Sequence, residues 1–179
     1  PARAPPPAAA ASGRGGLPTE RYYEEEGRAE LTPRDFGILM HRVFENAATT
    51  DEIYMAIEAM TQDGVLDEKE APRLRELVEK ALADPVTAEW FGGRWQVVRN
   101  ENEIILPGSG TTRRPDRVMT DGERAVVVDY KFGDRETARH RKQIREYLRL
   151  LRQMGYTRTE GYLWYVRLGR TERVEEKED

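Results

Sequence analysis

The sequence has no cysteine, only two histidines and no long apolar segment. Without cysteine the chain cannot hold an iron–sulfur cluster or a cysteine-ligated zinc ion, and it cannot use a thiol as a nucleophile. Charged residues make up 35% of the 179 residues, so a membrane-spanning segment is not expected. There is also no phosphate-binding loop of the G-x-x-x-x-G-K-[ST] type, which excludes an ATPase motor within these residues.

The acidic balance of the whole chain combines two unlike parts. Lys and Arg number 29 against 33 Asp and Glu, and the resulting net charge of −4 argues, taken alone, against nucleic acid as a partner. Residues 113–170, however, contain 15 basic and 8 acidic residues, whereas the rest of the chain contains 14 and 25. The net charge therefore does not exclude a DNA-binding surface in the second half of the chain.

Composition divides the chain into a middle part and two ends. Residues 1–33 contain three consecutive prolines, an alanine run and a Gly/Arg-rich stretch, a low-complexity pattern typical of a linker. Residues 171–179 are nearly all charged, and we expect them to fray. We expect one domain over residues 34–170. The linker and the first residue, Pro1 rather than Met, favour a module tethered within a longer polypeptide.

Within residues 34–170 the apolar pattern changes from helical to strand-like. Thr32-Pro33 followed by Asp35 predicts a helix start, and helical spacing continues this helix to about residue 47. Two more helices are predicted near 51–62 and 67–83. Runs rich in Val and Ile predict strands at 95–99, 103–106, 114–119 and 125–131. A long helix over about 135–154 and an aromatic strand at 161–167 follow. This order predicts a mixed α/β domain.

A predicted β-hairpin brings two acidic residues together. Asp121-Gly122 lies between two apolar runs, which is a strong signal for a two-residue turn. With these two residues as the turn, Asp116 lies opposite Val127. Asp129 then shares the face of Asp116 as its diagonal neighbour, about 7–8 Å away at the backbone. Two carboxylates at that separation can converge on one cation.

The chemistry of this hairpin suits phosphodiester hydrolysis. Carboxylates suit Mg²⁺ or Mn²⁺, which bind through one or two of them and a substrate phosphate. Lys131 projects from the same face, where an ammonium can stabilise developing charge, and the carbonyl of Tyr130 lies near the cluster. The alternative is a surface hairpin with incidental charges. Asp129, however, follows four apolar residues, where an unpaired acid is costly.

These residues resemble the signature of the PD-(D/E)xK nucleases. Four motifs in the chain are similar to those in the C-terminal nuclease domain of bacterial RecB- and AddA-type helicase-nucleases, and they occur in the same order as in that family. The motifs are Gly37-x-x-x-His41, Pro115-Asp116, Val127-x-Asp129-Tyr130-Lys131 and Gln143-x-x-x-Tyr147. The resemblance covers about residues 34–167.

The resemblance implies a restriction-endonuclease-like core, in which helices flank a mixed central sheet, with an extra N-terminal helical segment. It implies metal-dependent DNA cleavage, with Mg²⁺ or Mn²⁺ held by His41, Asp116, Asp129 and the backbone carbonyl of Tyr130. Lys131 would position or activate the attacking water and stabilise charge on the phosphate.

Several other residues keep two interpretations. Gln143 and Tyr147 would support the site or contact the DNA strand, because residues four apart share a helix face. Tyr147 fits equally well as a half-buried helix residue. Arg114 and Arg117 flank Asp116, and either could hold a phosphate or pair with a carboxylate.

His41 lies outside the apolar stripe of its predicted helix, and Glu45 one turn later could orient its ring. Gly37, one turn earlier, would allow another backbone or DNA to approach. Glu103, on the strand before the hairpin, is better explained as an exposed strand charge than as a site residue. We assign no catalytic role to His140.

The resemblance also implies partners and a cellular setting. These are DNA strands from an unwound duplex, a helicase motor in the same parent polypeptide, and a possible second helicase-nuclease subunit, acting in DNA repair or recombination in the bacterial cytoplasm. The cleavage expected in that setting is of the exonuclease type. Two alternatives remain: a free-standing restriction or resolvase-type endonuclease, and a non-catalytic nuclease-fold module that binds DNA or a partner subunit.

Overall fold

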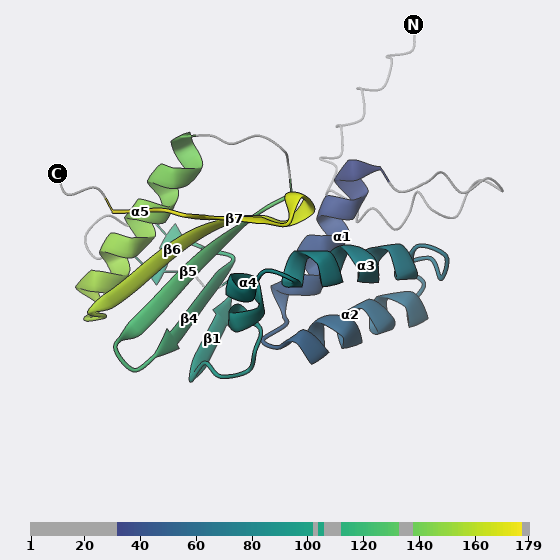
Figure 1. Cartoon of the computed structure of the whole chain (residues 1–179), viewed down its shortest axis with the longest axis horizontal. Coiled ribbons are helices and arrows are strands. Elements are labelled where there is room, and N and C mark those ends of the chain that lie inside the picture. Colours follow the sequence, from purple (N-terminus) through teal and green to yellow (C-terminus); the bar gives the residue numbers. More distant parts are fainter. Residues whose placement is uncertain (1–31, 102–103, 106–111, 133–137, 177–179) are drawn as a thin grey trace, which may run out of the picture. The chain divides into compact units, whose positions relative to one another are not determined.

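A computed structural model describes residues 32–101, 104–105, 112–132 and 138–176 (Figure 1). Nearly all of the predicted linker, residues 1–31, lies outside the described residues. In the described part of the chain, no helix has the length and apolar character needed to cross a membrane.

A five-stranded mixed sheet forms the centre of the domain, in the order β1-β4-β5-β6-β7. Its strands are β1 (Val97–Asn100), β4 (Arg117–Asp121), β5 (Arg124–Lys131), β6 (Arg158–Tyr165) and β7 (Arg170–Arg173). The β5–β6 pair is parallel, and the other pairs are antiparallel. Two short strands, β2 (Ile104–Ile105) and β3 (Thr112–Arg113), pair separately.

Helices cover this sheet, as expected for a restriction-endonuclease-like core. Four helices precede or lead into the sheet: α1 (Pro33–Glu45), α2 (Thr50–Gln62), α3 (Ala71–Leu82) and α4 (Pro85–Trp90). The fifth, α5 (Ala138–Gln153), connects the parallel strands β5 and β6, because such a pair needs a crossover. Figure 1 shows the strands between α5 and the group formed by α1, α2 and α3. A short 3₁₀ helix, η2 (Val166–Leu168), separates β6 from β7.

The starts of α1 and α2 follow from local capping chemistry. Thr32 accepts a hydrogen bond from the Asp35 N–H, and Asp35 accepts one from the Thr32 N–H. Thr49 and Glu52 form the same reciprocal arrangement before α2. Each arrangement satisfies two backbone donors that would otherwise lack partners. The predicted helix start at Thr32-Pro33 is therefore confirmed.

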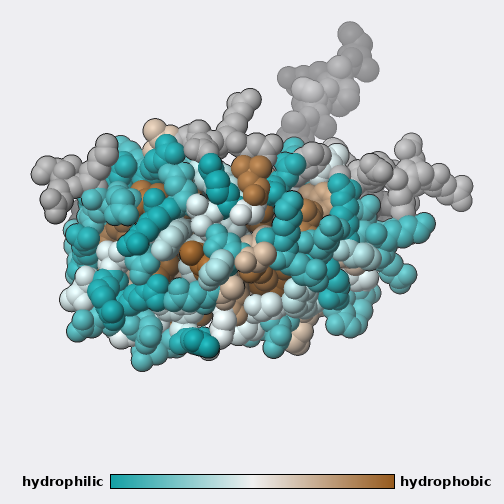
Figure 2. All heavy atoms as spheres, viewed as in Figure 1, coloured by the Kyte–Doolittle hydropathy of each residue, from teal (hydrophilic) through white to brown (hydrophobic). Residues whose placement is uncertain are grey.

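Strand β5 is buried on both faces and separates two apolar clusters. Val126, Val128 and Tyr130 pack with residues of α1, α2, α3 and α4, whereas Ala125 and Val127 pack with residues of α5. This alternation explains why the strand is a continuous apolar run in the sequence. The visible surface in Figure 2 is largely hydrophilic, with apolar side chains in small groups.

The hairpin register differs from the prediction by two residues. Asp121 pairs with Arg124, so the two loop residues are Gly122 and Glu123 rather than Asp121 and Gly122. Gly122 adopts a left-handed conformation (φ 57°), which glycine tolerates without steric cost. Continuing this register past β4 moves the position opposite Asp116 from Val127 to Asp129. Because the shift is two residues, the side chains within the paired strands β4 and β5 keep their predicted faces.

Two predicted boundaries and one missing element need correction. The tail predicted to fray supplies the edge strand β7, and Val174 beyond it is buried and donates its N–H to the Gly161 carbonyl (2.8 Å). Helix α4 forms where no element was predicted. The last predicted strand, 161–167, begins earlier and ends at Tyr165. The differences at β6 and β7 arise from tertiary pairing, which local sequence patterns do not encode. Helix α4 does carry a local signal, since Asp84 caps it and Pro85 lies in its first turn.

Candidate metal centre

His41 lies on α1 beside the segment that follows β5. Its ring meets the edge of the Phe132 ring at a centroid distance of 5.9 Å. Gly37, one turn earlier on α1, makes this approach possible, since a Cβ at this position would lie 3.2 Å from the Cβ of Phe132. The close approach expected at Gly37 is therefore made by Phe132.

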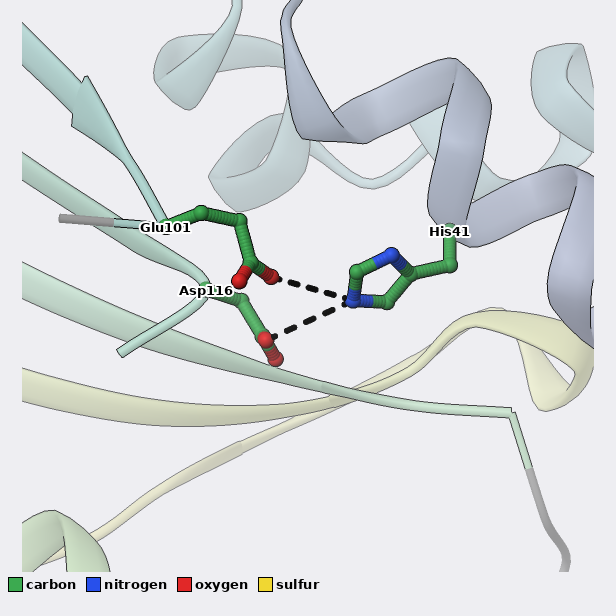
Figure 3. A group of neighbouring side chains, drawn as sticks. All are labelled: His41, Glu101 and Asp116. Carbon is green, nitrogen blue, oxygen red and sulfur yellow. Dashed lines mark ion pairs between the residues drawn. The ribbon is translucent and has the colours of Figure 1, made fainter. Parts of the chain in front are cut away.

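The side chains of His41, Glu101 and Asp116 come from separate segments and converge on one another (Figure 3). Nε2 of His41 lies 3.1 Å from Oε1 of Glu101 and 3.7 Å from Oδ1 of Asp116. One potential ligand atom of each residue lies within 4.8 Å of the others, and all three side chains are partly buried. Helix α1, the end of β1 and the segment before β4 each contribute one of them. This group has the composition and spacing of a cation site.

Glu101 reaches this position through an unusual backbone conformation. Its φ is 52°, and it is the only non-glycine residue with positive φ in the described part of the chain. Its N–H donates to the carbonyl of Asp116 (3.0 Å), and Nε of Arg114 donates to its carboxylate (2.5 Å). Backbone strain of this kind persists where the surrounding contacts fix it, often at functional sites.

Glu101 was not predicted as a site residue. Glu103, which was weighed as one and explained as an exposed strand charge, lies outside the described residues. Residues two apart lie on one face of a strand, so the pattern offers no means of choosing between the two. The choice depends on the end of β1 at Asn100, where the chain turns into the left-handed conformation.

Asp116 connects the hairpin to α1. It precedes β4, so its side chain is free of the sheet alternation and reaches toward His41. Its Oδ2 accepts a hydrogen bond from the Tyr130 N–H (2.5 Å), which ties it to β5. The Tyr130 backbone therefore lies against Asp116, while the Tyr130 side chain is buried in the core.

Asp129 and Lys131 form an ion pair with each other on β5. Asp129 is only 4% exposed, and it is not one of the three residues grouped around His41. Burial raises the pKa of the Asp129 carboxyl, the Lys131 ammonium lowers it, and the charge of Asp116 raises it further. Glu101 and Asp116 thus both lie beside His41, and their charges also act on the carboxyl group of Asp129.

The acidic surroundings also shift the pKa of His41. A hydrogen bond with Asp116 raises this pKa, burial opposes the rise, and the charges of Asp116, Glu101 and Glu45 add to it. Glu45, expected to orient the ring, acts here through its charge. The imidazole therefore holds a proton more firmly than usual, as expected for a histidine beside carboxylates.

On α5 the predicted pair is present, but one member lies in the core. Nε2 of Gln143 donates to the Tyr147 hydroxyl (3.0 Å), and Tyr147 is completely buried in the apolar cluster beneath α5. Tyr147 therefore supports Gln143 from the interior. His140, also on α5, has its pKa lowered by burial and by the charges of Lys131 and Arg139.

The two arginines near Asp116 have different environments. Arg114 is exposed and pairs with Glu101. Arg117 is fully buried, and its guanidinium donates to backbone carbonyls in the core. Of the two interpretations kept for Arg117, the phosphate contact does not fit its full burial, because its position on β4 turns its side chain toward α4 and the α1–α2 connection.

Comparison with known proteins identifies a family. The model of the PD-(D/E)XK nuclease superfamily matches residues 14–179, which include every side chain of the candidate metal centre. A comparison with curated proteins gives no significant match.

Proposed function

Since the chain belongs to the PD-(D/E)XK nuclease superfamily, a group of metal-dependent nucleases, we propose that it hydrolyses phosphodiester bonds of DNA strands with the aid of Mg²⁺ or Mn²⁺. One observation carries this proposal: His41, Glu101 and Asp116 converge beside the Asp129–Lys131 pair. The arrangement joins a cation site to a fixed ammonium group.

The donor set fits a hard divalent cation. Two carboxylates and one imidazole can surround an ion here, and carboxylate oxygens are ligands that Mg²⁺ and Mn²⁺ favour. The hydrogen bond with Asp116 and the charges of Asp116 and Glu101 raise the pKa of His41, and burial together with the same two carboxylates raises the pKa of Asp129. A cation would neutralise the negative charge of these carboxylates. The imidazole makes Mn²⁺ the better probe, since nitrogen ligands suit transition metals.

We assign the metal ligands as follows. His41, Glu101 and Asp116 hold the ion, and Asp129 and the backbone carbonyl of Tyr130 complete the protein ligands. When bound, such an ion polarises the phosphodiester and lowers the pKa of a water molecule. The Tyr130 N–H donates to Asp116 and holds it in place. The main chain of Tyr130 would therefore support the site through its N–H and bind the ion through its carbonyl.

Lys131 and the surrounding residues orient and stabilise the substrate in this proposal. The Lys131 ammonium, paired with Asp129, stabilises negative charge that develops on the phosphate and helps to position the attacking water. Arg114, anchored by Glu101, presents an exposed guanidinium for a neighbouring phosphate. Gln143, held by Tyr147, supports the site from α5.

We further propose that the substrate is a strand released from an unwound duplex and that cleavage is exonucleolytic. The motif order in the sequence supports this setting, since it resembles that of helicase-nuclease domains. The proposed partners are a helicase motor in the same parent polypeptide and possibly a second helicase-nuclease subunit. The setting is DNA repair or recombination in the bacterial cytoplasm.

Cleavage of labelled linear single- and double-stranded DNA tests the nuclease proposal. The protein should shorten the DNA with Mg²⁺ or Mn²⁺ and not with EDTA, and Asp129→Ala should abolish cleavage while the protein stays folded. Lack of metal-dependent cleavage, also when the domain is joined to its parent chain, would favour a non-catalytic nuclease-fold module.

Circular single-stranded DNA distinguishes the mode of cleavage. An exonuclease leaves circles intact and degrades linear strands of the same sequence. An endonuclease that acts on single strands would cut the circles as well, whereas a free-standing restriction or resolvase-type enzyme would cut duplex circles instead. Degradation of both substrates at equal rates would therefore overturn the exonuclease part of the proposal and leave the nuclease part unaffected.

A further inference from the structure

Arg117 is a charged side chain with 0% exposure at the start of β4. Burying a guanidinium is costly unless its donors find acceptors. Its Nη1 donates to the Ala47 carbonyl (2.6 Å), and its Nη2 donates to the carbonyls of Ala48 (2.8 Å) and Trp90 (2.7 Å). The guanidinium also lies over the Phe91 ring, 4.1 Å from its centroid. One side chain is thus held by four residues distant in sequence.

These acceptors lie where elements end. Ala47 and Ala48 belong to the connection between α1 and α2, and Trp90 is the last residue of α4. Carbonyls near helix ends lack partners within the helix, so the fork of Arg117 satisfies groups that the helices leave open. A lysine could supply a charge here, but its single ammonium cannot reproduce the planar fork.

Asn100 extends this network to β1. Its Oδ1 accepts from Nη1 of Arg117 (3.2 Å), and its Nδ2 donates to the same Ala47 carbonyl (3.1 Å). Arg117, Asn100 and Ala47 therefore form a closed set of hydrogen bonds. We call this set, together with the carbonyls of Ala48 and Trp90, the Arg117 clamp.

The Arg117 clamp holds the three segments that carry the candidate metal ligands. Asp116 immediately precedes Arg117, Glu101 immediately follows Asn100, and His41 lies on the helix that leads into Ala47. The N–H of Glu101 also donates to the carbonyl of Asp116, which links two of these segments directly. The separation of the ligands thus depends on contacts made behind them in the core.

We propose that Arg117 is a positioning residue, which sets the distances among His41, Glu101 and Asp116 by fixing α1, β1 and β4 to one another. This inference rests on the proposed function, because it gives the clamp a role in metal binding beyond stabilising the fold. A purely structural role would lower stability without a specific effect on the metal site.

Mn²⁺ titration by calorimetry of Arg117→Lys, with Val174→Ala as control, separates the two roles. Val174 packs in the apolar cluster on the α5 side of the sheet, so its truncation lowers stability away from the clamp. Both proteins should be folded at the titration temperature, as shown by circular dichroism. We expect Arg117→Lys to weaken Mn²⁺ binding at least about tenfold and to lower kcat more than it raises KM for DNA. Val174→Ala should stay within about twofold of the wild type in Mn²⁺ affinity.

An Arg117→Lys protein that binds Mn²⁺ as tightly as the wild type would overturn this inference. If Arg117→Lys does not fold, Asn100→Ala decides, since it removes one side chain of the clamp and leaves the guanidinium. An affinity loss of at least about threefold would support the clamp, and a smaller change would refute it. Failure of the wild type to bind Mn²⁺ would overturn the proposed function as well, so the two failures are distinguishable.

Discussion

At the scale of single residues, the candidate site depends on an acidic side chain in a strained position. Glu101 combines a left-handed backbone conformation with contacts to His41 and Arg114. A glutamate pays a steric penalty in this region, where glycine does not. The contacts of its carboxylate and its N–H hold it there, which indicates that the position serves the site rather than the stability of β1.

Glu101→Gln tests whether this carboxylate binds the metal. The variant keeps the length of the side chain and the backbone strain but removes the charge. We expect Mn²⁺ affinity to fall at least about tenfold, while the free energy of unfolding changes by less than about 1 kcal/mol, since the Arg114 partner is exposed. Calorimetric titration and urea unfolding measure the two quantities.

Arg114→Gln is the matched control for this substitution. It removes the same ion pair from the opposite side and leaves the carboxylate, so Mn²⁺ affinity should stay within about threefold of the wild type. If both variants bound Mn²⁺ like the wild type, the carboxylate would serve only to anchor Arg114, and Glu101 would not be a ligand.

His41 gives the metal-free protein a defined pH dependence. Because the folded state raises its pKa above the ordinary value of 6.5, the folded state binds this proton more tightly than the unfolded state does. The stability contributed by His41 is therefore complete below pH 6.5 and is lost as the pH rises through the raised pKa.

Urea unfolding of the metal-free wild type and of His41→Gln, from about pH 5 to about pH 9, checks this sign. The stability advantage of the wild type should shrink as the pH rises. Mn²⁺ affinity should increase over the same range, since the ion competes with the proton for the imidazole. An advantage that grows with pH in the absence of metal would contradict the assigned electrostatic environment.

At the scale of elements, the helices and strands that were predicted well are those with strong local sequence signals. The capping residues Thr32 and Asp35 place the start of α1, and the apolar run before Asp129 places β5. The hairpin turn was misplaced, because Asp121 is suited to a turn by propensity but pairs instead with Arg124. The charge of Arg124 is held by Glu89 and Glu160 from other elements. Local propensity does not contain such contacts.

The packing of α5 on β6 is an element-scale feature that a single methyl group can test. Gly161 lies where α5 approaches the sheet, and a Cβ there would lie 2.4 Å from Cγ2 of Ile144. Gly161→Ala should therefore destabilise the fold by about 1–3 kcal/mol through overpacking, as measured by urea unfolding.

A double-mutant cycle with Ile144→Ala shows whether the clash is the cause. Removing the Ile144 side chain makes room for the new methyl group, so Gly161→Ala should cost less in that background than in the wild type. Equal costs in both backgrounds would mean that the contact with Ile144 is not the cause.

At the scale of the whole molecule, the site lies where several elements meet. Contacts between these elements determine the roles of some site residues, so the sequence alone does not predict those roles. His41, Asp116, Asp129 and Lys131 were selected from motifs; the structure groups His41 with Asp116 and pairs Asp129 with Lys131. Glu101 was missed, and Arg117 was considered only as a partner of a phosphate or a carboxylate, because both roles depend on contacts between β1, β4 and the ends of α1 and α4. A pattern in one segment carries no information about such contacts.

The charge difference between the two parts of the chain predicts a salt-dependent interaction with DNA. Basic residues dominate residues 113–170, and Arg139 and Lys142 are exposed on α5 near His140, which senses the charge of Lys131. If about three phosphates are contacted, the affinity for single-stranded DNA in EDTA should fall at least about tenfold between about 50 mM and about 200 mM NaCl.

Substitutions locate the surface responsible for this salt dependence. Arg139→Gln combined with Lys142→Gln should make the plot of log affinity against log salt less steep. Lys80→Gln, on the exposed surface of α3, should leave the slope unchanged. Equal effects of the two changes, measured by fluorescence anisotropy, would show that DNA does not bind preferentially along α5.

We expect His41, Glu101 and Asp116 to hold the metal of the proposed nuclease. The most direct measurement is a crystal structure with Mn²⁺ and a short DNA strand, in which anomalous scattering locates the ion. We expect an anomalous peak bonded to all three side chains, with a phosphate of the strand beside it and near Lys131. A peak elsewhere, or none among these residues at a saturating Mn²⁺ concentration, would contradict this expectation.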